Sequence, residues 1–173
     1  MSTVLIAALR AIQMIFGIIC LALSVQLARG QLIGNAPSTT IFDAFAGGFT
    51  LVAAIVCLAG LAWSALAGKV SFAVDTVAAL AALAGGIATV VELRGVTCGT
   101  DYEMYYNSLI NGGLENIKGE PVSGLTIPQM TTRCNMNKAD SAFLFLAFVI
   151  SSVLLVLSFT NQKLGTIGGR TYV

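Results

Sequence analysis

Charged side chains inside long apolar segments are the first candidates for chemistry in this sequence. Arg10 lies in an apolar run that begins near Val4, and Asp75 lies in the first turns of another that begins near Val70. A charge inside a membrane span is costly, so such residues mark ion pairs or proton and ion pathways. The chain has no histidine, the usual general base and commonest metal ligand. No nucleophile, base and orienting group can be assembled, so we expect no enzyme activity, no metal and no cofactor.

Cysteine placement gives the second candidate. Cys98 and Cys134 bracket a polar stretch that contains no other cysteine, whereas Cys20 and Cys57 fall in apolar runs and are interpreted as small packing residues. A disulfide between Cys98 and Cys134 would persist only on an oxidising, extracytoplasmic side. It would stabilise the fold by roughly a few kcal/mol. The alternative is two free thiols in a cytoplasmic loop.

The elements that carry these residues are predicted to be membrane spans. The 173-residue chain is 57% hydrophobic and 10% charged, with a mean hydropathy of +0.88, whereas a soluble domain carries roughly 25% charged residues. A spanning helix needs about 20 mostly apolar residues, and four segments qualify, at about residues 4–28, 41–67, 70–91 and 142–160. Barrel strands would alternate apolar and polar residues, which these runs do not. A signal peptide is the alternative for the first run, which is too long for one and lacks a clear cleavage site.

We therefore expect an all-α membrane protein, a four-helix transmembrane bundle that forms one domain over residues 1–173. A tight turn at Gly68 and Lys69 joins the second and third spans. Residues 94–141 form a long loop that holds most of the charge, and residues 161–173 form a short polar tail. The nine Lys and Arg are scattered on both sides, so the positive-inside rule does not decide the orientation, and nucleic-acid binding is not expected. A disulfide-stapled extracytoplasmic loop would place both termini in the cytoplasm.

The two intramembrane charges are predicted to face each other. Arg10 lies about 10 Å along the first span and Asp75 about 8 Å along the third, at about 1.5 Å per residue. Both enter from the same side in this topology, so we predict an ion pair or a water-bridged pair. The functional alternative is a proton or ion relay, which needs several polar groups along a path.

Small residues predict where the helices approach one another closely, because lipid supplies no hydrophobic force between helices. Ala78, Ala82 and Gly86 recur at a spacing of four and form one smooth face, which predicts that the third span is central in the bundle. Gly48 and Gly60 offer similar positions on the second span. The alternative is that alanine and glycine are simply common in such a chain.

The long loop contains a tyrosine-rich segment. Thr100-Asp101-Tyr102-Glu103 has the form of a capping box, which predicts a short helix that stops at Gly112-Gly113. This helix would carry Tyr102, Tyr105 and Tyr106. Such residues favour the membrane interface, and the alternative is a partner-binding surface. Residues 115–129 contain glycine and proline and are predicted to be irregular.

Several of these motifs together resemble the MARVEL four-span family, and within it the fungal non-classical-export and eisosome-associated proteins. The likeness rests on Ala8-Leu9-Arg10-Ala11-Ile12, on Ala73-Val74-Asp75, and on Thr132-Arg133-Cys134 followed by Ser141-Ala142-Phe143-Leu144-Phe145. Two other four-span families fit the sequence less well. Claudin-like proteins place their long loop and cysteine pair between spans one and two, where this chain has only a short turn. Tetraspanins have a Cys-Cys-Gly motif and at least four cysteines in their last large loop, where this chain has Thr97-Cys98-Gly99 and only two cysteines.

The resemblance implies a non-enzymatic plasma-membrane protein of fungal type that organises lateral domains, eisosomes, protein sorting or export. It also implies membrane lipids as partners, with sterol and sphingolipid as candidates, and either self-association or association with a larger membrane protein. The alternative is a small oligomeric channel or transporter whose path follows Arg10 and Asp75. A sealed bundle would favour the organiser, and a continuous polar conduit would favour the transporter.

Overall fold

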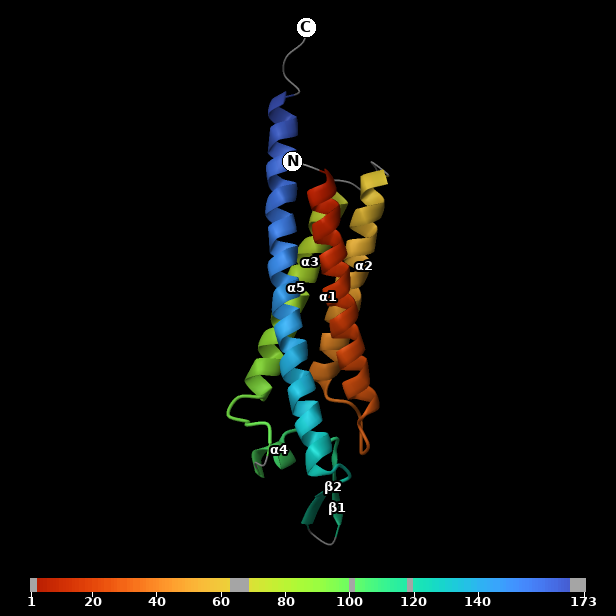
Figure 1. The fold of residues 1–173 in the computed structure, drawn as a ribbon, viewed down its shortest axis with the longest axis vertical. Coiled ribbons are helices and arrows are strands. Elements are labelled where there is room, and N and C mark those ends of the chain that lie inside the picture. Colours follow the sequence, from red (N-terminus) through yellow and green to blue (C-terminus); the bar gives the residue numbers. More distant parts are fainter. Residues whose placement is uncertain (1–2, 63–68, 100–101, 118–119, 169–173) are drawn as a thin grey trace.

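A computed structural model describes residues 3–62, 69–99, 102–117 and 120–168. Four long helices lie side by side: α1 (Thr3–Arg29), α2 (Ser38–Ala62), α3 (Lys69–Glu92) and α5 (Ile127–Gly168) (Figure 1). Each is long and apolar enough to cross a membrane. The start of α1 and the end of α5 lie at one end of the bundle, which we call the terminal end. The opposite end carries the segment between α3 and α5, and we call it the loop end (Figure 1).

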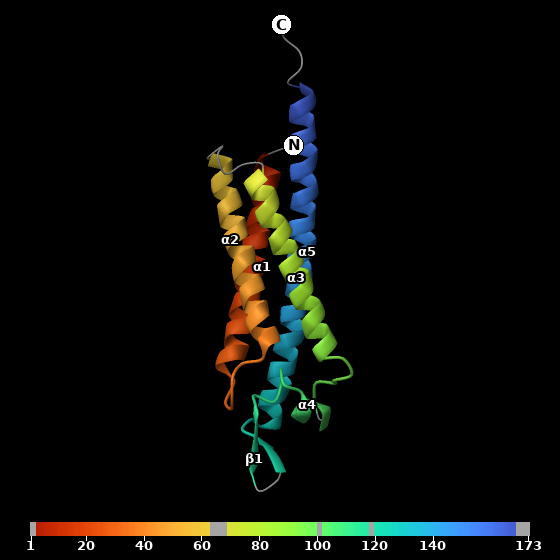
Figure 2. The ribbon, with the colours of Figure 1, turned by 180° about the vertical axis from the view of Figure 1, so that it is seen from behind.

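The four helices form a ring in which α1 packs against α2 and α5, and α3 packs against the same two helices. Figures 1 and 2 show α1 beside α2, and α3 beside α5. Across the ring, α2 also contacts α5. The prediction of a central third span is therefore wrong, because α3 packs mainly against the same two helices as α1. Small residues permit close contact on whichever side they face, so their spacing does not determine which helix is central.

Helix α5 is much longer than the predicted fourth span. It begins at Ile127, whereas the sequence predicted a loop up to residue 141 and a span from 142. Thr126 caps its start, because the Thr126 backbone N–H and hydroxyl each donate to Gln129 Oε1 at 2.9 Å. The helix continues to Gly168, through much of the predicted polar tail. Its 42 residues extend for about 60 Å, about twice the hydrocarbon thickness of a bilayer.

The loop end is a small folded unit. It contains the short helix α4 (Tyr102–Tyr106) and an antiparallel hairpin of β1 (Leu114–Ile117) and β2 (Glu120–Ser123), in which Leu114 pairs with Ser123. Its core contains Leu93, Met104, Leu109, Ile110, Met130 and Cys134. The prediction of an irregular segment over residues 115–129 is therefore wrong. The predicted helix ends at Tyr106 and not at Gly112. Three other predicted features lie outside the described residues: the cap of this helix at Thr100, the turn at Gly68, and residues 63–67 of the second span.

The connection between α1 and α2 docks onto this unit. The backbone N–H groups of Leu32 and Ile33 donate to the Gly112 carbonyl oxygen at 2.9 and 3.1 Å. Gly113 has a positive φ of 99°, and a Cβ there would overlap the Ile33 carbonyl group. A glycine is therefore required at position 113. The α1–α2 connection and the segment between α3 and α5 are thus packed together at the loop end.

Candidate functional site

A buried ion pair joins α1 to α3 near the terminal end. The Arg10 Nη1 and Nη2 atoms lie 2.5 Å from Asp75 Oδ1 and Oδ2, respectively. Arg10 is 3% exposed and Asp75 is fully buried. A guanidinium and a carboxylate in this two-bond arrangement satisfy each other's geometry and cancel each other's charge. Neither charge is therefore left alone among the spans, where an isolated charge is expensive.

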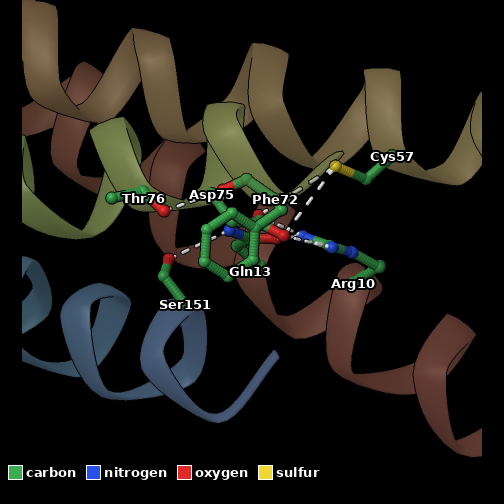
Figure 3. Close-up of polar contacts among 7 residues, drawn as sticks. All are labelled: Arg10, Gln13, Cys57, Phe72, Asp75, Thr76 and Ser151. Atoms are coloured by element: carbon green, nitrogen blue, oxygen red, sulfur yellow. Dashed lines mark hydrogen bonds and ion pairs between the residues drawn. The ribbon is translucent and has the colours of Figure 1, made fainter. Parts of the chain in front are cut away.

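Three more polar side chains extend this pair to all four long helices. Arg10 Nη1 also donates to Gln13 Oε1 at 2.8 Å, and Gln13 Nε2 donates to Ser151 Oγ on α5 at 3.0 Å (Figure 3). The Cys57 thiol on α2 lies 4.0 Å from both carboxylate oxygens of Asp75. We call Arg10, Gln13, Cys57, Asp75 and Ser151 the Arg10 cluster. Gln13 and Ser151 were not predicted, although Gln13 is a polar residue within the first span, three positions after Arg10.

An apolar layer lies between the Arg10 cluster and the loop end. Its residues are almost completely buried: Cys20, Ala46, Ala82, Leu144 and Ala147. Phe16, Ala81, Phe143 and Phe148 pack against them, and the rings of Phe16 and Phe143 have centroids 5.9 Å apart. The side chains of this layer are hydrocarbon, apart from the thiol of Cys20, which lies beside Asp140.

Two buried carboxylates lie beyond that layer, toward the loop end. The Thr89 hydroxyl on α3 donates to Asp43 Oδ2 on α2 at 2.5 Å, and the Ser24 hydroxyl on α1 donates to Asp140 Oδ2 on α5 at 2.6 Å. Asp43 is 2% exposed and Asp140 is 1% exposed. Within the described ranges neither has a cationic partner. Each carboxylate is thus held by a hydroxyl from a neighbouring helix, and the sequence did not predict either of these bonds.

A close contact between α1 and α2 depends on two glycines that the sequence analysis did not select. A Cβ at Gly47 would lie 2.6 Å from the backbone nitrogen of Leu21, and one at Gly17 would lie 2.9 Å from that of Leu51. The predicted packing residue Gly48 faces only the Leu21 side chain, and a Cβ there would lie 3.7 Å from Leu21 Cδ1. The close contact therefore falls on Gly47, one position before the predicted residue, because about 100° of helix rotation separates the two.

The other predicted packing residues lie inside the bundle. Ala78 and Ala82 on α3 are fully buried, and Gly60 near the end of α2 is buried as well. A Cβ at Gly86 would lie 3.1 Å from the ring of Phe145 on α5. The structure thus brings Gly86 against a large side chain, so the small residue makes room for an aromatic ring.

The predicted disulfide is present at the loop end. Cys98 and Cys134 are bonded, with their Cα atoms 5.7 Å apart and a sequence separation of 36. Cys134 lies in α5 and is fully buried in the loop-end core. The bond therefore ties the start of the long connection directly to the last helix. Cys20 and Cys57 are free and buried within the spans.

The three predicted tyrosines divide between the surface and the interior. Tyr102 and Tyr106 are exposed, with their hydroxyl oxygens 2.7 Å apart. Tyr105 instead lies against the loop-end core, and its hydroxyl oxygen accepts the Ser123 backbone N–H at 2.9 Å. Only two of the three therefore offer an exposed surface, while Tyr105 attaches the hairpin to α4.

Comparison with known proteins assigns the chain to a family. A family model described as the MARVEL membrane-associating domain matches residues 3–157. The chain belongs to the MARVEL family. Searches among curated proteins and among solved structures give no significant match. The matched range of this MARVEL domain contains both members of the ion pair, both cysteines of the disulfide and all four candidate spans up to residue 157.

In the part of the chain that the structure describes, no group of three or more His, Cys, Asp or Glu residues is placed to hold a metal ion. The polar side chains of the spans bond mainly to one another and so connect neighbouring helices. These features, with four apolar helices, are those of an integral membrane protein.

Proposed function

We propose that this MARVEL protein is a non-enzymatic membrane organiser that acts through its lipid-facing and helix-packing surfaces. The observation that carries the proposal is the apolar layer between the Arg10 cluster and the two buried carboxylates. Ala46, Ala82 and Leu144 are fully buried in that layer. The polar groups at the two levels therefore do not connect, as they would in a transport path.

The spacing along the helices supports this interpretation. Gln13 of the Arg10 cluster and Ser24 beside Asp140 are separated by about 16 Å along α1. The intervening level on α2 contains Thr50, whose hydroxyl donates to the Ala46 carbonyl oxygen of its own helix at 2.8 Å. A relay needs successive donors and acceptors, and these groups are bonded locally or lie too far apart. The Arg10 charge is moreover neutralised by Asp75.

The outer surface of the bundle suits lipid and protein contacts. Large apolar side chains project from each span and are exposed, among them Ile15, Val52, Leu80 and Val149. In the finer proposal this surface sorts sterol, sphingolipid or other lipids in a plasma membrane of fungal type, and contacts further copies or a larger membrane protein. Organisation of eisosomes, protein sorting or export would follow from such contacts.

The disulfide supports an orientation for this proposal. A Cys98–Cys134 bond persists in an oxidising compartment. The loop end would then face the extracytoplasmic side, and the start of α1 and the end of α5 would face the cytoplasm. The exposed pair Tyr102 and Tyr106 would lie outside the cell, available to the membrane interface or to a partner.

Reconstitution tests the organiser against the transporter. The purified protein is placed in liposomes for proton and potassium flux, and in giant vesicles of phosphatidylcholine, sphingolipid and sterol for imaging of lipid domains. We expect flux equal to that of empty liposomes, and enrichment of the protein in one lipid phase with a change in domain size. Robust flux that Arg10→Gln alters would establish the transporter instead. A uniform distribution without effect on the domains would contradict the organiser.

A further inference from the structure

A second buried arginine lies at the loop end. Arg133 on α5 is only 6% exposed. Its Nη1 donates to the Leu27 carbonyl oxygen at 3.0 Å, and its Nη2 approaches Gln31 Oε1 and the Leu109 carbonyl oxygen, each at 3.4 Å. All three acceptors are neutral. Arg133 thus bridges α5, the last turn of α1 and the loop-end unit without meeting a negative charge there.

The Arg133 charge is uncompensated within the described ranges. No carboxylate forms an ion pair with it, and its buried Nε has no hydrogen-bond partner. Arg10 shows the contrast, because Asp75 neutralises it. A buried charge and a buried donor without partners both cost free energy. An anion beside Arg133 would remove the cost of the uncompensated charge.

A cavity lies where that anion would bind. It has a volume of about 290 Å³ and lies between the last turn of α1 and the first turns of α5, with Arg133 in its lining. Gln26 and Thr132 contribute amide and hydroxyl groups, and Leu125 and Met136 contribute an apolar side. The cavity is at the level where the apolar span of α1 ends, which is the level of lipid headgroups.

Gly30 keeps the guanidinium in this position. A Cβ at Gly30 would lie 2.5 Å from Arg133 Nη1. Gly30 also lines the cavity. The absence of a side chain at residue 30 therefore leaves room for the guanidinium beside the end of α1, and any larger residue there would displace it.

We propose that this cavity binds a phosphate group through Arg133. A guanidinium matches phosphate oxygens with directed, charge-assisted hydrogen bonds, and the Arg133 guanidinium has no anionic partner within the described ranges. The phosphate belongs either to a phospholipid headgroup, whose glycerol and acyl parts would contact Leu125 and Met136, or to free phosphate. The site is independent of the proposed organising role, since it rests on Arg133 and its cavity alone.

Thermal unfolding of the full chain in phosphate-free maltoside micelles tests the site. The probes are inorganic phosphate, dihexanoyl phosphatidylglycerol and, as a phosphate-free match, dihexanoylglycerol. We expect a phosphate-bearing probe in large excess to raise the Tm by on the order of 5 °C, with no rise from dihexanoylglycerol. A rise with the lipid alone assigns a lipid headgroup, and a rise with inorganic phosphate assigns the free anion. No rise with either, or an equal rise with dihexanoylglycerol, overturns the proposal.

Three variants locate the effect. Arg133→Gln removes the charge and is expected to abolish the Tm rise. Gly30→Ala keeps the charge but displaces the guanidinium, so it reduces the rise and serves if Arg133→Gln fails to fold. Arg29→Gln removes an exposed charge from the same end of α1 and is expected to keep the full rise. The proposal is overturned if Gly30→Ala and Arg133→Gln keep the rise, or if Arg29→Gln loses it as well.

Discussion

Arg10 and Asp75 stand 65 positions apart in the sequence, yet both terminal nitrogens of Arg10 lie 2.5 Å from the carboxylate oxygens of Asp75. The two residues belong to α1 and α3, which lie diagonally in the ring of helices and each pack on α2 and α5. The pair therefore links helices that do not pack extensively against each other. Because the pair is buried inside the spans, the four helices must pack in an arrangement that keeps the two side chains together.

We predict that removing either member of the ion pair destabilises the protein more than removing both. Removing one partner of a buried pair leaves the other charge unpaired and costs about 3–5 kcal/mol. Arg10→Gln and Asp75→Asn should each lower the Tm strongly in micelles, and the double variant should recover most of the loss. Tm and the folded fraction after size exclusion measure the effect. Losses that simply add in the double variant would show that the two side chains act independently.

The ion pair and the disulfide could be predicted from the sequence because few residue types can form either interaction. An arginine in a span needs an anion, and Asp75 was a nearby candidate at similar depth. The ring order was not predictable in this way. It depends on which helices the face of α3 formed by Ala78, Ala82 and Gly86 meets, and a face of small residues does not specify its partners. Similarly, Gln13 and Ser151 are uncharged, so neither demands a partner strongly enough to be paired from the sequence.

The start of α5 was missed although a local signal exists. Thr126-Ile127-Pro128-Gln129 is a capping box with proline in the first turn. Glycine and proline just before it favoured an irregular segment instead. The hairpin strands have only four residues each, too few for an alternating pattern to stand out. The docking of Leu32 and Ile33 on Gly112 joins distant parts of the chain, which no local pattern reports.

The contact between α1 and α2 gives a prediction on two adjacent residues. Gly47→Ala would place a methyl group 2.6 Å from the Leu21 backbone nitrogen, so the helices must separate. Gly48→Ala meets only the Leu21 side chain at ordinary contact distance. We expect Gly47→Ala to lower the Tm by several degrees and Gly48→Ala to leave it unchanged or raise it slightly, because alanine favours the helix. Equal effects of the two substitutions on the Tm would contradict this packing.

Reduction of the disulfide should loosen the loop end while the bundle remains. Closing a loop of this length stabilises a fold by about 4 kcal/mol on the chain-entropy account. Cys98→Ser and Cys134→Ser should each lower the free energy of unfolding by about this amount, which is measured as a fall in the Tm. Maleimide–polyethylene glycol should label no cysteine of the folded, oxidised protein, since Cys20 and Cys57 are buried. Labelling at Cys98 or Cys134 without a reductant would show that the bond does not form.

A final prediction concerns the contact between the two connections at the loop end. Gly113 and Gly95 both have positive φ, 99° and 83°, so alanine is strained at either position by about 1–2 kcal/mol. At Gly95 a Cβ meets nothing within 4 Å, whereas at Gly113 it overlaps the Ile33 carbonyl group. Gly95→Ala therefore measures the strain alone, and Gly113→Ala measures strain plus the loss of docking. We expect the second substitution to lower the Tm further and to speed amide hydrogen exchange at Leu32 and Ile33, whose N–H groups bond to Gly112. If exchange at those two amides matched that of Gly95→Ala, the α1–α2 connection would not depend on this contact.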